Sequence, residues 1–326
     1  MKKTMRTMLA AAAAGVLIAG VSGSLPAQAQ GVPESDESIK LALNEWTGQH
    51  ITTYVAGELL KQMGYNVEYV TAGYYPQMTA LTDGTIDATL EIWSSNIGEH
   101  YQKSLDSGQV VEVGDLGLAP VEAWYYPDYV AEMCPGLPDW EALKNCSELF
   151  ATADTYPSGR FVDYPPDWGT TNVDRMRSLG LDYVNIPAGS EGAMVAEIES
   201  SVANRKPLIM QFWAPHWIHA VHDMTIVTLP PHEAACYDDP SWGINPNDVY
   251  DCDWERGYIK KMVWLGMKDE WPAAFRFLHE YTLTNADQEP MMKAIDVDGR
   301  DIVEVVQEWI GNNADRWKPW VDKAMM

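Results

Sequence analysis

The hydrophobic pattern between residues 39 and 92 alternates between a strand-like and a helix-like period. Residues 39–43 alternate in the way typical of a strand, and residues 50–63 place an apolar side chain at every fourth position, which is typical of one helix face. Residues 66–71 and 86–92 predict two further strands, with a helix over 76–81 between them. Strand–helix–strand alternation predicts parallel strands joined by crossover helices, which is an α/β architecture.

The pattern weakens in the middle of the chain and then returns. Residues 125–168 are rich in Pro, Tyr, Asp and Gly and predict mostly irregular structure, with one short helix around 139–144. Ser190 is typical of an N-cap and predicts a helix that ends near Asn204. Residues 206–212 and 258–266 predict two more strands, and the chain after them is expected to be helical.

The N-terminus has the three regions of an export signal. Lys2, Lys3 and Arg6 precede an uncharged apolar stretch, and an Ala-x-Ala pattern ends at Ala29. We therefore expect a signal peptide over residues 1–29 with cleavage after Ala29. The apolar stretch is too short for a stable membrane anchor, so the mature protein is predicted to be free in the periplasm.

Length and charge exclude several classes of partner. About 300 residues remain after cleavage. A single hydrophobic core rarely supports a chain of this length, which favours two domains. The formal net charge of −25 repels phosphate backbones and anionic lipid, so nucleic acid and membrane surfaces are disfavoured as partners. We expect a monomer.

The four cysteines predict disulfide bonds, because an even number in an oxidising compartment favours pairing. Three pairings are possible. The pairing of sequence neighbours, Cys134 with Cys146 and Cys236 with Cys252, would close two Pro- and Asp-rich loops. Neither pair has the spacing of a zinc site, so structural disulfides are preferred to metal binding.

Tryptophan is the most informative residue type in the sequence. There are 14 Trp against 5 Phe, and the motifs typical of hydrolases, phosphate-binding loops and zinc enzymes are lacking, so we predict a binding protein and no enzyme and expect no cofactor. Trp46, Trp93 and Trp213 are predicted just past strand ends, where α/β proteins bind ligands. Trp168 belongs to a Pro-Pro-Asp-Trp-Gly turn.

A cage of indoles suits a trimethylammonium group. Such a group is a full cation without an N–H donor, so it is recognised by aromatic faces and by contact with its methyl groups. Each indole contributes roughly 0.5–2 kcal/mol as the site dries. Three or four rings would supply most of a micromolar affinity, which is about −8 kcal/mol.

Several ordered segments resemble the glycine betaine/choline/proline betaine substrate-binding family of ABC importers. They are Asn-Glu-Trp-Thr-Gly at 44–48, the stretch 74–93 that ends in Leu-Glu-Ile-Trp, Tyr-Pro-Pro-Asp-Trp-Gly at 164–169 and Gln-Phe-Trp-Ala-Pro-His-Trp at 211–217. The resemblance extends from about residue 39 to the C-terminus. It implies a type II periplasmic binding protein with two α/β lobes joined by a hinge.

The resemblance also implies a ligand site. Trp93, Trp168 and Trp213 match the family's aromatic box around the ammonium head, and Trp46 matches a further aromatic residue of choline-type members. Tyr125 is a candidate for one more, with Trp124 as the alternative.

A ligand carboxylate would be held by the backbone amides of Gly169 and Thr170 together with His216. Gly48 stands where choline-type members tend to have an acid. Glu91 and Glu122 are acids near the predicted cleft that could contact a cation or hydroxyl.

We therefore expect lobe 1 over residues 36–122 and 255–326, and lobe 2 over 123–254. The protein is predicted to capture glycine betaine, proline betaine or choline for osmoprotection or nutrition and to deliver it to an ABC permease in the inner membrane. Trimethylamine N-oxide and carnitine are alternatives. Less favoured are a secreted carbohydrate-active protein and a metal scavenger that uses His50, His100, His216, His219 and His222.

Overall fold

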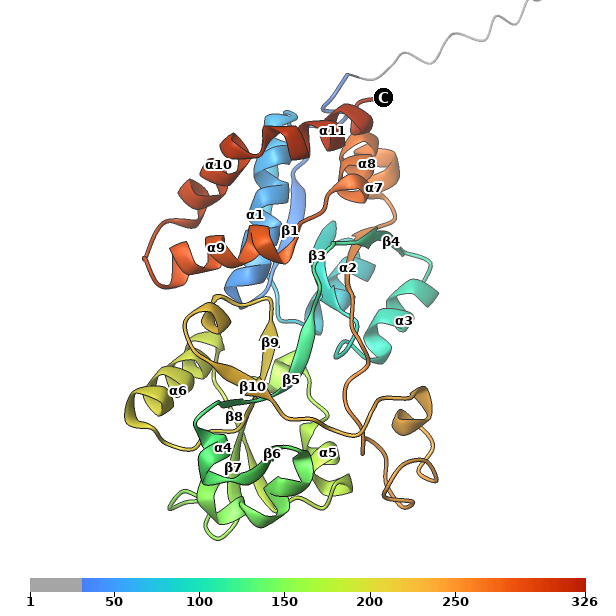
Figure 1. Ribbon diagram of the computed structural model, residues 1–326. Coiled ribbons are helices and arrows are strands. Elements are labelled where there is room, and N and C mark those ends of the chain that lie inside the picture. The colour runs from blue at the N-terminus through green and yellow to red at the C-terminus, as the bar shows by residue number, and fades with distance from the viewer. Residues whose placement is uncertain (1–30) are drawn as a thin grey trace, which may run out of the picture. The chain divides into compact units, whose positions relative to one another are not determined.

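Two five-stranded mixed sheets dominate the computed structural model, which describes residues 31–326 (Figure 1). The predicted signal peptide and its cleavage site after Ala29 lie outside the described residues. Across residues 31–326, every helix is too short or too polar to cross a membrane. The α/β architecture predicted from the pattern is confirmed.

We call the region around the first sheet lobe 1. Its strand order is β2-β1-β3-β11-β4; β1 runs parallel to β2 and β3, and β11 runs antiparallel to β3 and β4. The strands of this sheet are β1 (Ile39–Leu43), β2 (Val67–Thr71), β3 (Ala88–Trp93), β4 (Val110–Asp115) and β11 (Ile259–Trp264).

Helices from both ends of the described chain pack in lobe 1. They are α1 (Thr47–Gln62), α2 (Pro76–Thr82), α3 (Glu99–Asp106), α7 (Met267–Glu270), α8 (Pro272–Glu280), α9 (Asn285–Asp296), α10 (Ile302–Asn312) and α11 (Ala314–Ala324). Ile51, Val55 and Leu59 of α1 are fully buried, as the four-residue period predicts. Both α9 and α10 pack against α1 (Figure 1).

The second sheet forms lobe 2, in the order β10-β5-β9-β7-β8. Its elements are β5 (Val121–Pro127), α4 (Val130–Met133), β6 (Pro135–Pro138), η1 (Trp140–Asn145), η2 (Ser147–Phe150), β7 (Gly159–Asp163), η3 (Pro166–Trp168), α5 (Asn172–Ser178), β8 (Tyr183–Pro187), α6 (Glu191–Asn204), β9 (Met210–Ala214), η4 (Trp217–Ala220), β10 (Met224–Ile226) and η5 (Ala234–Tyr237). The Ser190 hydroxyl caps α6 by accepting from the Ala193 N–H at 3.2 Å, as the sequence predicts.

The chain passes between the two sheets twice. The first passage covers residues 116–120, between β4 and β5, and the second covers 227–258, between β10 and β11. Lobe 1 therefore takes strands from both sides of the segment that builds lobe 2.

The sequence misplaced some strands of lobe 2. The segment predicted as mostly irregular contains the end of β5 and the buried strand β7. The strand predicted at 206–212 lies at 210–214, and Trp213 is inside it, just as Trp93 is the last residue of β3. The two tryptophans thus project from the ends of paired strands, which hold them more firmly than loops would.

Both sequence-local disulfides are present. Cys134 pairs with Cys146, and Cys236 pairs with Cys252, so each closes one of the loops rich in Pro and Asp.

Candidate ligand-binding site

Aromatic side chains from both lobes line one cavity. We call it the cage. Its lining residues are Trp46, Tyr74, Trp93, Asn96, Glu122, Tyr164, Trp168 and Trp213. The four tryptophans named from the sequence therefore surround one cavity, and each is only 4–5% exposed.

The lobe 1 side of the cage consists of residues at or just after the ends of β1, β2 and β3. Trp46 follows β1 and is the N-cap residue of α1, while Trp93 ends β3. Tyr74 fixes the backbone of Trp93 twice: its hydroxyl accepts from the Trp93 N–H at 2.9 Å and donates to the Trp93 carbonyl at 3.2 Å. This double contact sets the position at which the Trp93 ring enters the cage.

A tight turn after β7 carries Trp168. Asp163, at the end of β7, is fully buried and accepts from Thr170 Oγ1 at 2.9 Å and Asn172 Nδ2 at 2.6 Å, which fastens the two ends of the turn. Gly169 has a φ of 80°, and a Cβ there would lie 1.7 Å from the Tyr75 hydroxyl. The turn therefore requires glycine beside Trp168 for both backbone and space.

The rings of the two lobes touch in this closed arrangement. Trp46 of lobe 1 meets Trp168 of lobe 2 edge to face at 5.2 Å, and Trp168 meets Trp213 at 5.6 Å. Trp213 in turn stacks on Phe212 at 4.4 Å. A continuous aromatic surface therefore surrounds the cavity.

Glu122 is the one carboxylic acid among the lining residues of the cage. It is 8% exposed, accepts from Asn96 Nδ2 at 3.2 Å, and is also hydrogen-bonded by Ser95 Oγ. Burial raises the pKa of Glu122, against the smaller lowering effect of its hydrogen-bonding neighbours Ser95 and Tyr164. None of the eight lining residues is Lys, Arg or His, so the site offers aromatic faces and an acid to its ligand.

A second, more polar cavity shares Asn96, Glu122 and Tyr164 with the cage. Gly169 and Thr170 line this second cavity and not the cage itself.

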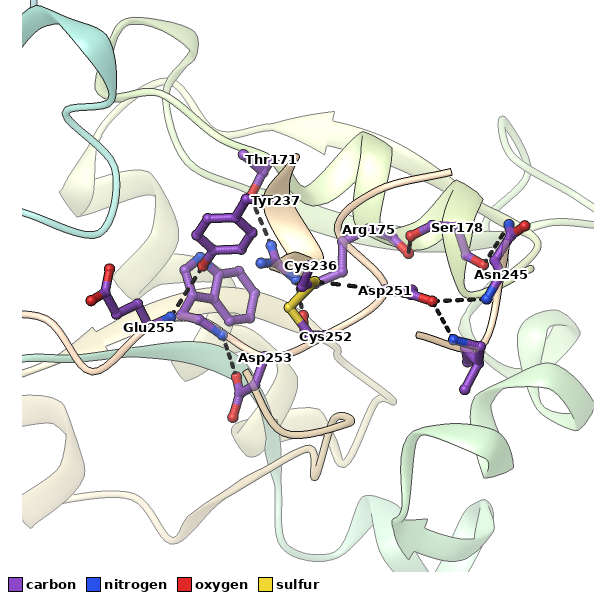
Figure 2. The surroundings of a disulfide bond; sticks show 12 residues. Thr171, Arg175, Ser178, Cys236, Tyr237, Asn245, Asp251, Cys252, Asp253 and Glu255 are labelled. Atoms are coloured by element: carbon purple, nitrogen blue, oxygen red, sulfur yellow. Dashed lines mark hydrogen bonds between the residues drawn. A yellow bond between two sulfur atoms is a disulfide. The ribbon is translucent and has the colours of Figure 1, made fainter. Parts of the chain in front are cut away.

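The loop closed by Cys236 and Cys252 forms part of the wall of the second cavity through Tyr237 and Tyr250, and Trp254 and Glu255, just after the loop, also line it. Figure 2 shows how Arg175 of α5 holds this loop: its Nε donates to the Cys252 carbonyl at 2.6 Å and its Nη1 to Thr171 Oγ1 at 2.7 Å.

The remaining residues named from the sequence lie outside the cage. The Tyr125 ring packs against Phe212 and His219, and Trp124 is fully buried, with its Nε1 donating to Asn172 Oδ1 at 2.7 Å. His216 is 1% exposed and its Nε2 lies 3.2 Å from Glu191 Oε1.

His216 belongs to a cluster that joins the lobes. Glu191 of lobe 2 accepts from the Thr47 N–H of lobe 1 at 2.8 Å, and Asp296 of lobe 1 accepts from Trp217 Nε1 of lobe 2 at 2.9 Å. Glu191, His216 and Asp296 offer ligand atoms within 4.8 Å of one another, which is a possible metal geometry.

Hydrogen bonds argue against a metal ion in that cluster. The Ile218 N–H donates to His216 Nδ1 at 3.1 Å, so a neutral imidazole has its proton on Nε2, which faces Glu191. The Nε2 lone pair is then not free for a metal, and the cluster holds the lobes together.

The sequence reasoning did not single out Tyr74, Asn96 and Tyr164. Two of them stand in segments on which the family resemblance rests: Tyr74 opens the stretch 74–93, and Tyr164 is the first residue of the 164–169 turn. Only the fold brings these hydroxyls and the Asn96 amide to the same cavity.

Comparison with known proteins agrees with this geometry. A family model described as the substrate-binding domain of the ABC-type glycine betaine transport system (OpuAC) matches residues 37–312. The chain is 30% identical over 329 residues to the trimethylamine N-oxide-binding protein of Pelagibacter ubique, covering 98% of this chain and 99% of that protein.

Solved structures share the fold at lower identity. The glycine betaine/L-proline-binding protein ProX of Borrelia burgdorferi aligns with a TM-score of 0.71 at 20% identity, covering 89% of this chain and 98% of that one. Lactococcal OpuAC, in its closed conformation with glycine betaine, aligns with a TM-score of 0.67 at 19% identity, covering 88% and 100%.

Proposed function

The chain belongs to the family of substrate-binding domains of ABC-type glycine betaine transport systems, and on that premise we propose that its cage captures a small methylated amine for delivery to a membrane permease. The protein acts outside the cytoplasm as a monomer whose signal peptide is removed after Ala29. It captures the ligand, closes around it and releases it to the permease, without catalysis.

The observation that carries this proposal is the lining of the cage. Four indoles and two phenol rings from both lobes face one cavity, and the lining contains no Lys, Arg or His. Aromatic faces attract a methylated cation that has no N–H to donate, and the attraction strengthens as water is excluded. A ligand whose main feature were a carboxylate would find no positive side chain there.

The lining favours trimethylamine N-oxide within this class. The oxide oxygen needs a hydrogen-bond donor, and Glu122 supplies one in its protonated form, which burial favours by raising the pKa of Glu122. The relative from Pelagibacter ubique, which is similar over nearly the whole chain, is named for this ligand.

Glycine betaine is the second candidate, and the family match is the observation that favours it. Its carboxylate would have to reach the second cavity, where the Gly169 and Thr170 segment lies. Choline needs no such contact, because Glu122 as a carboxylate accepts its hydroxyl.

Isothermal titration of folded, ligand-free protein tests the proposal. The panel is trimethylamine N-oxide, choline, glycine betaine, proline betaine and carnitine, with a sugar and an amino acid as controls. We expect micromolar or tighter binding of at least one methylated amine, with trimethylamine N-oxide the tightest. Heat from the controls alone would contradict the proposed class.

A further inference from the structure

A buried carboxylate lies directly behind the lobe 1 side of the cage. Glu91 stands two residues before Trp93 on β3 and is 1% exposed. Its Oε1 accepts from Trp46 Nε1 at 2.8 Å and from Trp93 Nε1 at 3.1 Å. Its Oε2 accepts from Thr52 Oγ1 at 2.8 Å and from Gln288 Nε2 at 3.3 Å.

The donors around Glu91 are arranged for an anion. An indole N–H can only donate, so both acceptor positions of Oε1 are used by the two tryptophans. The Thr52 hydroxyl accepts from Gln288 at 3.1 Å and is therefore free to donate to Glu91. Burial raises the pKa of Glu91 above its ordinary value, although each of the four donors acts to lower it.

Glu91 has no ion-pair partner among the described residues. A buried charge without a counter-ion is costly, and hydrogen bonds offset only part of that cost. The two indoles that contact Glu91 also line the cage, where a cationic ligand head would bind.

We propose that Glu91 is a positioning residue that fixes the rings of Trp46 and Trp93 and makes this side of the cage selective for a cationic head. It acts through the two indoles: hydrogen bonding to an anion increases the electron density on the indole faces, which strengthens their attraction for a cation. The carboxylate also supplies the charge that complements the ligand. The selectivity for a cationic head rests on the proposed function, because that function names the ligand. The positioning of the two rings by Glu91 does not depend on it.

Ligand selectivity gives the first test. Choline and its uncharged isostere 3,3-dimethylbutan-1-ol have the same shape, and their binding is followed by titration and ligand-observed NMR. In Glu91→Gln the amide oxygen still accepts from the indoles but the charge is lost. We expect choline affinity to fall about tenfold or more while the affinity for the isostere changes less than about twofold. Equal losses for both ligands would overturn the charge role.

A matched control is available on the same strand region. Asp87 is a buried carboxylate next to β3 that accepts from the Lys40 N–H at 2.7 Å, outside the cage. Asp87→Asn removes a buried charge without touching the indoles, so the ratio of choline to isostere affinity should stay at the wild-type value.

The indole N–H resonances give a second test that needs no ligand. Spectra of Trp46→Phe and Trp93→Phe assign the two signals. In Glu91→Gln we expect both signals to move upfield and to exchange faster with water, with the remaining indoles unchanged. Unmoved signals would overturn the positioning role.

Glu91→Asp keeps the charge but moves it away from the two indoles. It tests the positioning role if Glu91→Gln does not fold. Its two indole signals should move as well. Wild-type protein that binds no methylated ammonium compound would refute the proposed function, while these signals would still decide the role of Glu91.

Discussion

The two sides of the cage are built differently, although each contributes two tryptophans. In lobe 1, the indoles of Trp46 and Trp93 both donate to Glu91, which belongs to the same lobe. In lobe 2, Trp213 is held by stacking on Phe212, and Trp168 Nε1 donates across the cleft to Glu45 at 2.9 Å. The lobe 1 side can therefore form by itself, whereas the lobe 2 side is completed only when the lobes meet.

This difference indicates that the two sides of the cage act at different stages of ligand binding. A ligand would first meet the prearranged indoles of lobe 1, since their hydrogen bonds do not depend on closure. Closure would then bring Trp168 and Trp213 over it, with the contacts of Thr47 to Glu191 and of Trp217 to Asp296 holding the lobes together.

The largest effects are expected when one aromatic ring is removed from each side of the cage. Trp93→Ala and Trp213→Ala should each weaken binding of the best methylated amine by about a hundredfold or more, because each loses an aromatic face and opens the cage to water. Trp93→Ala should lose more, since it also leaves Glu91 without one donor. Titration calorimetry measures both.

Trp320→Ala is the control for this pair, because Trp320 lies on α11 outside the cage. A larger loss in Trp213→Ala than in Trp93→Ala would contradict the view that lobe 1 provides the primary contact.

A pH titration of ligand affinity tests the role of Glu122, which lies between the two sides of the cage. Burial holds its pKa above the ordinary value of 4.5, and the protonated form donates to an N-oxide. Affinity for trimethylamine N-oxide should therefore be highest at low pH and fall by up to about tenfold per pH unit between the Glu122 pKa of the free protein and its higher pKa in the complex. Choline affinity should hold or rise over the same range.

Glu122→Gln should remove this dependence, and its comparison with the wild type cancels any protonation of the ligand itself. A wild-type slope that persists in the variant would assign the titration to another group.

The smallest effect is expected from the contact across the cleft. Glu45→Ala removes the acceptor of Trp168 Nε1 but leaves the aromatic rings of the cage in place. We expect a two- to fivefold loss of affinity, about 0.5–1 kcal/mol, mainly as faster dissociation in stopped-flow fluorescence. Glu99→Ala, which removes an exposed acid on α3, should change neither rate. An unchanged dissociation rate in Glu45→Ala would mean that Trp168 is held by its own turn.

The sequence predicted the periodic parts of the molecule well. The strand at 39–43, the amphipathic helix that follows and the N-cap at Ser190 are local signals, and the structure contains all three. It failed for β7, because a short buried strand amid prolines has no alternating pattern and depends on its partners β8 and β9.

The candidate site was predicted in the same uneven way. Four tryptophans at expected element ends predicted an aromatic cage, and all four line the cavity. The contribution of Tyr164 and the link from Glu91 to two indoles depend on contacts between segments far apart in the chain. Spacing along the sequence does not encode such contacts.

The place of β11 in the first sheet has a consequence for the order of folding. β11 lies between β3 and β4, so neither strand has its partner on that side until the chain has been made as far as residue 264. All strands of the second sheet come earlier in the sequence. Lobe 2 can therefore acquire its complete set of strands while the sheet that presents Trp93 still has a gap, which makes the ligand-selective half of the protein the last to be finished.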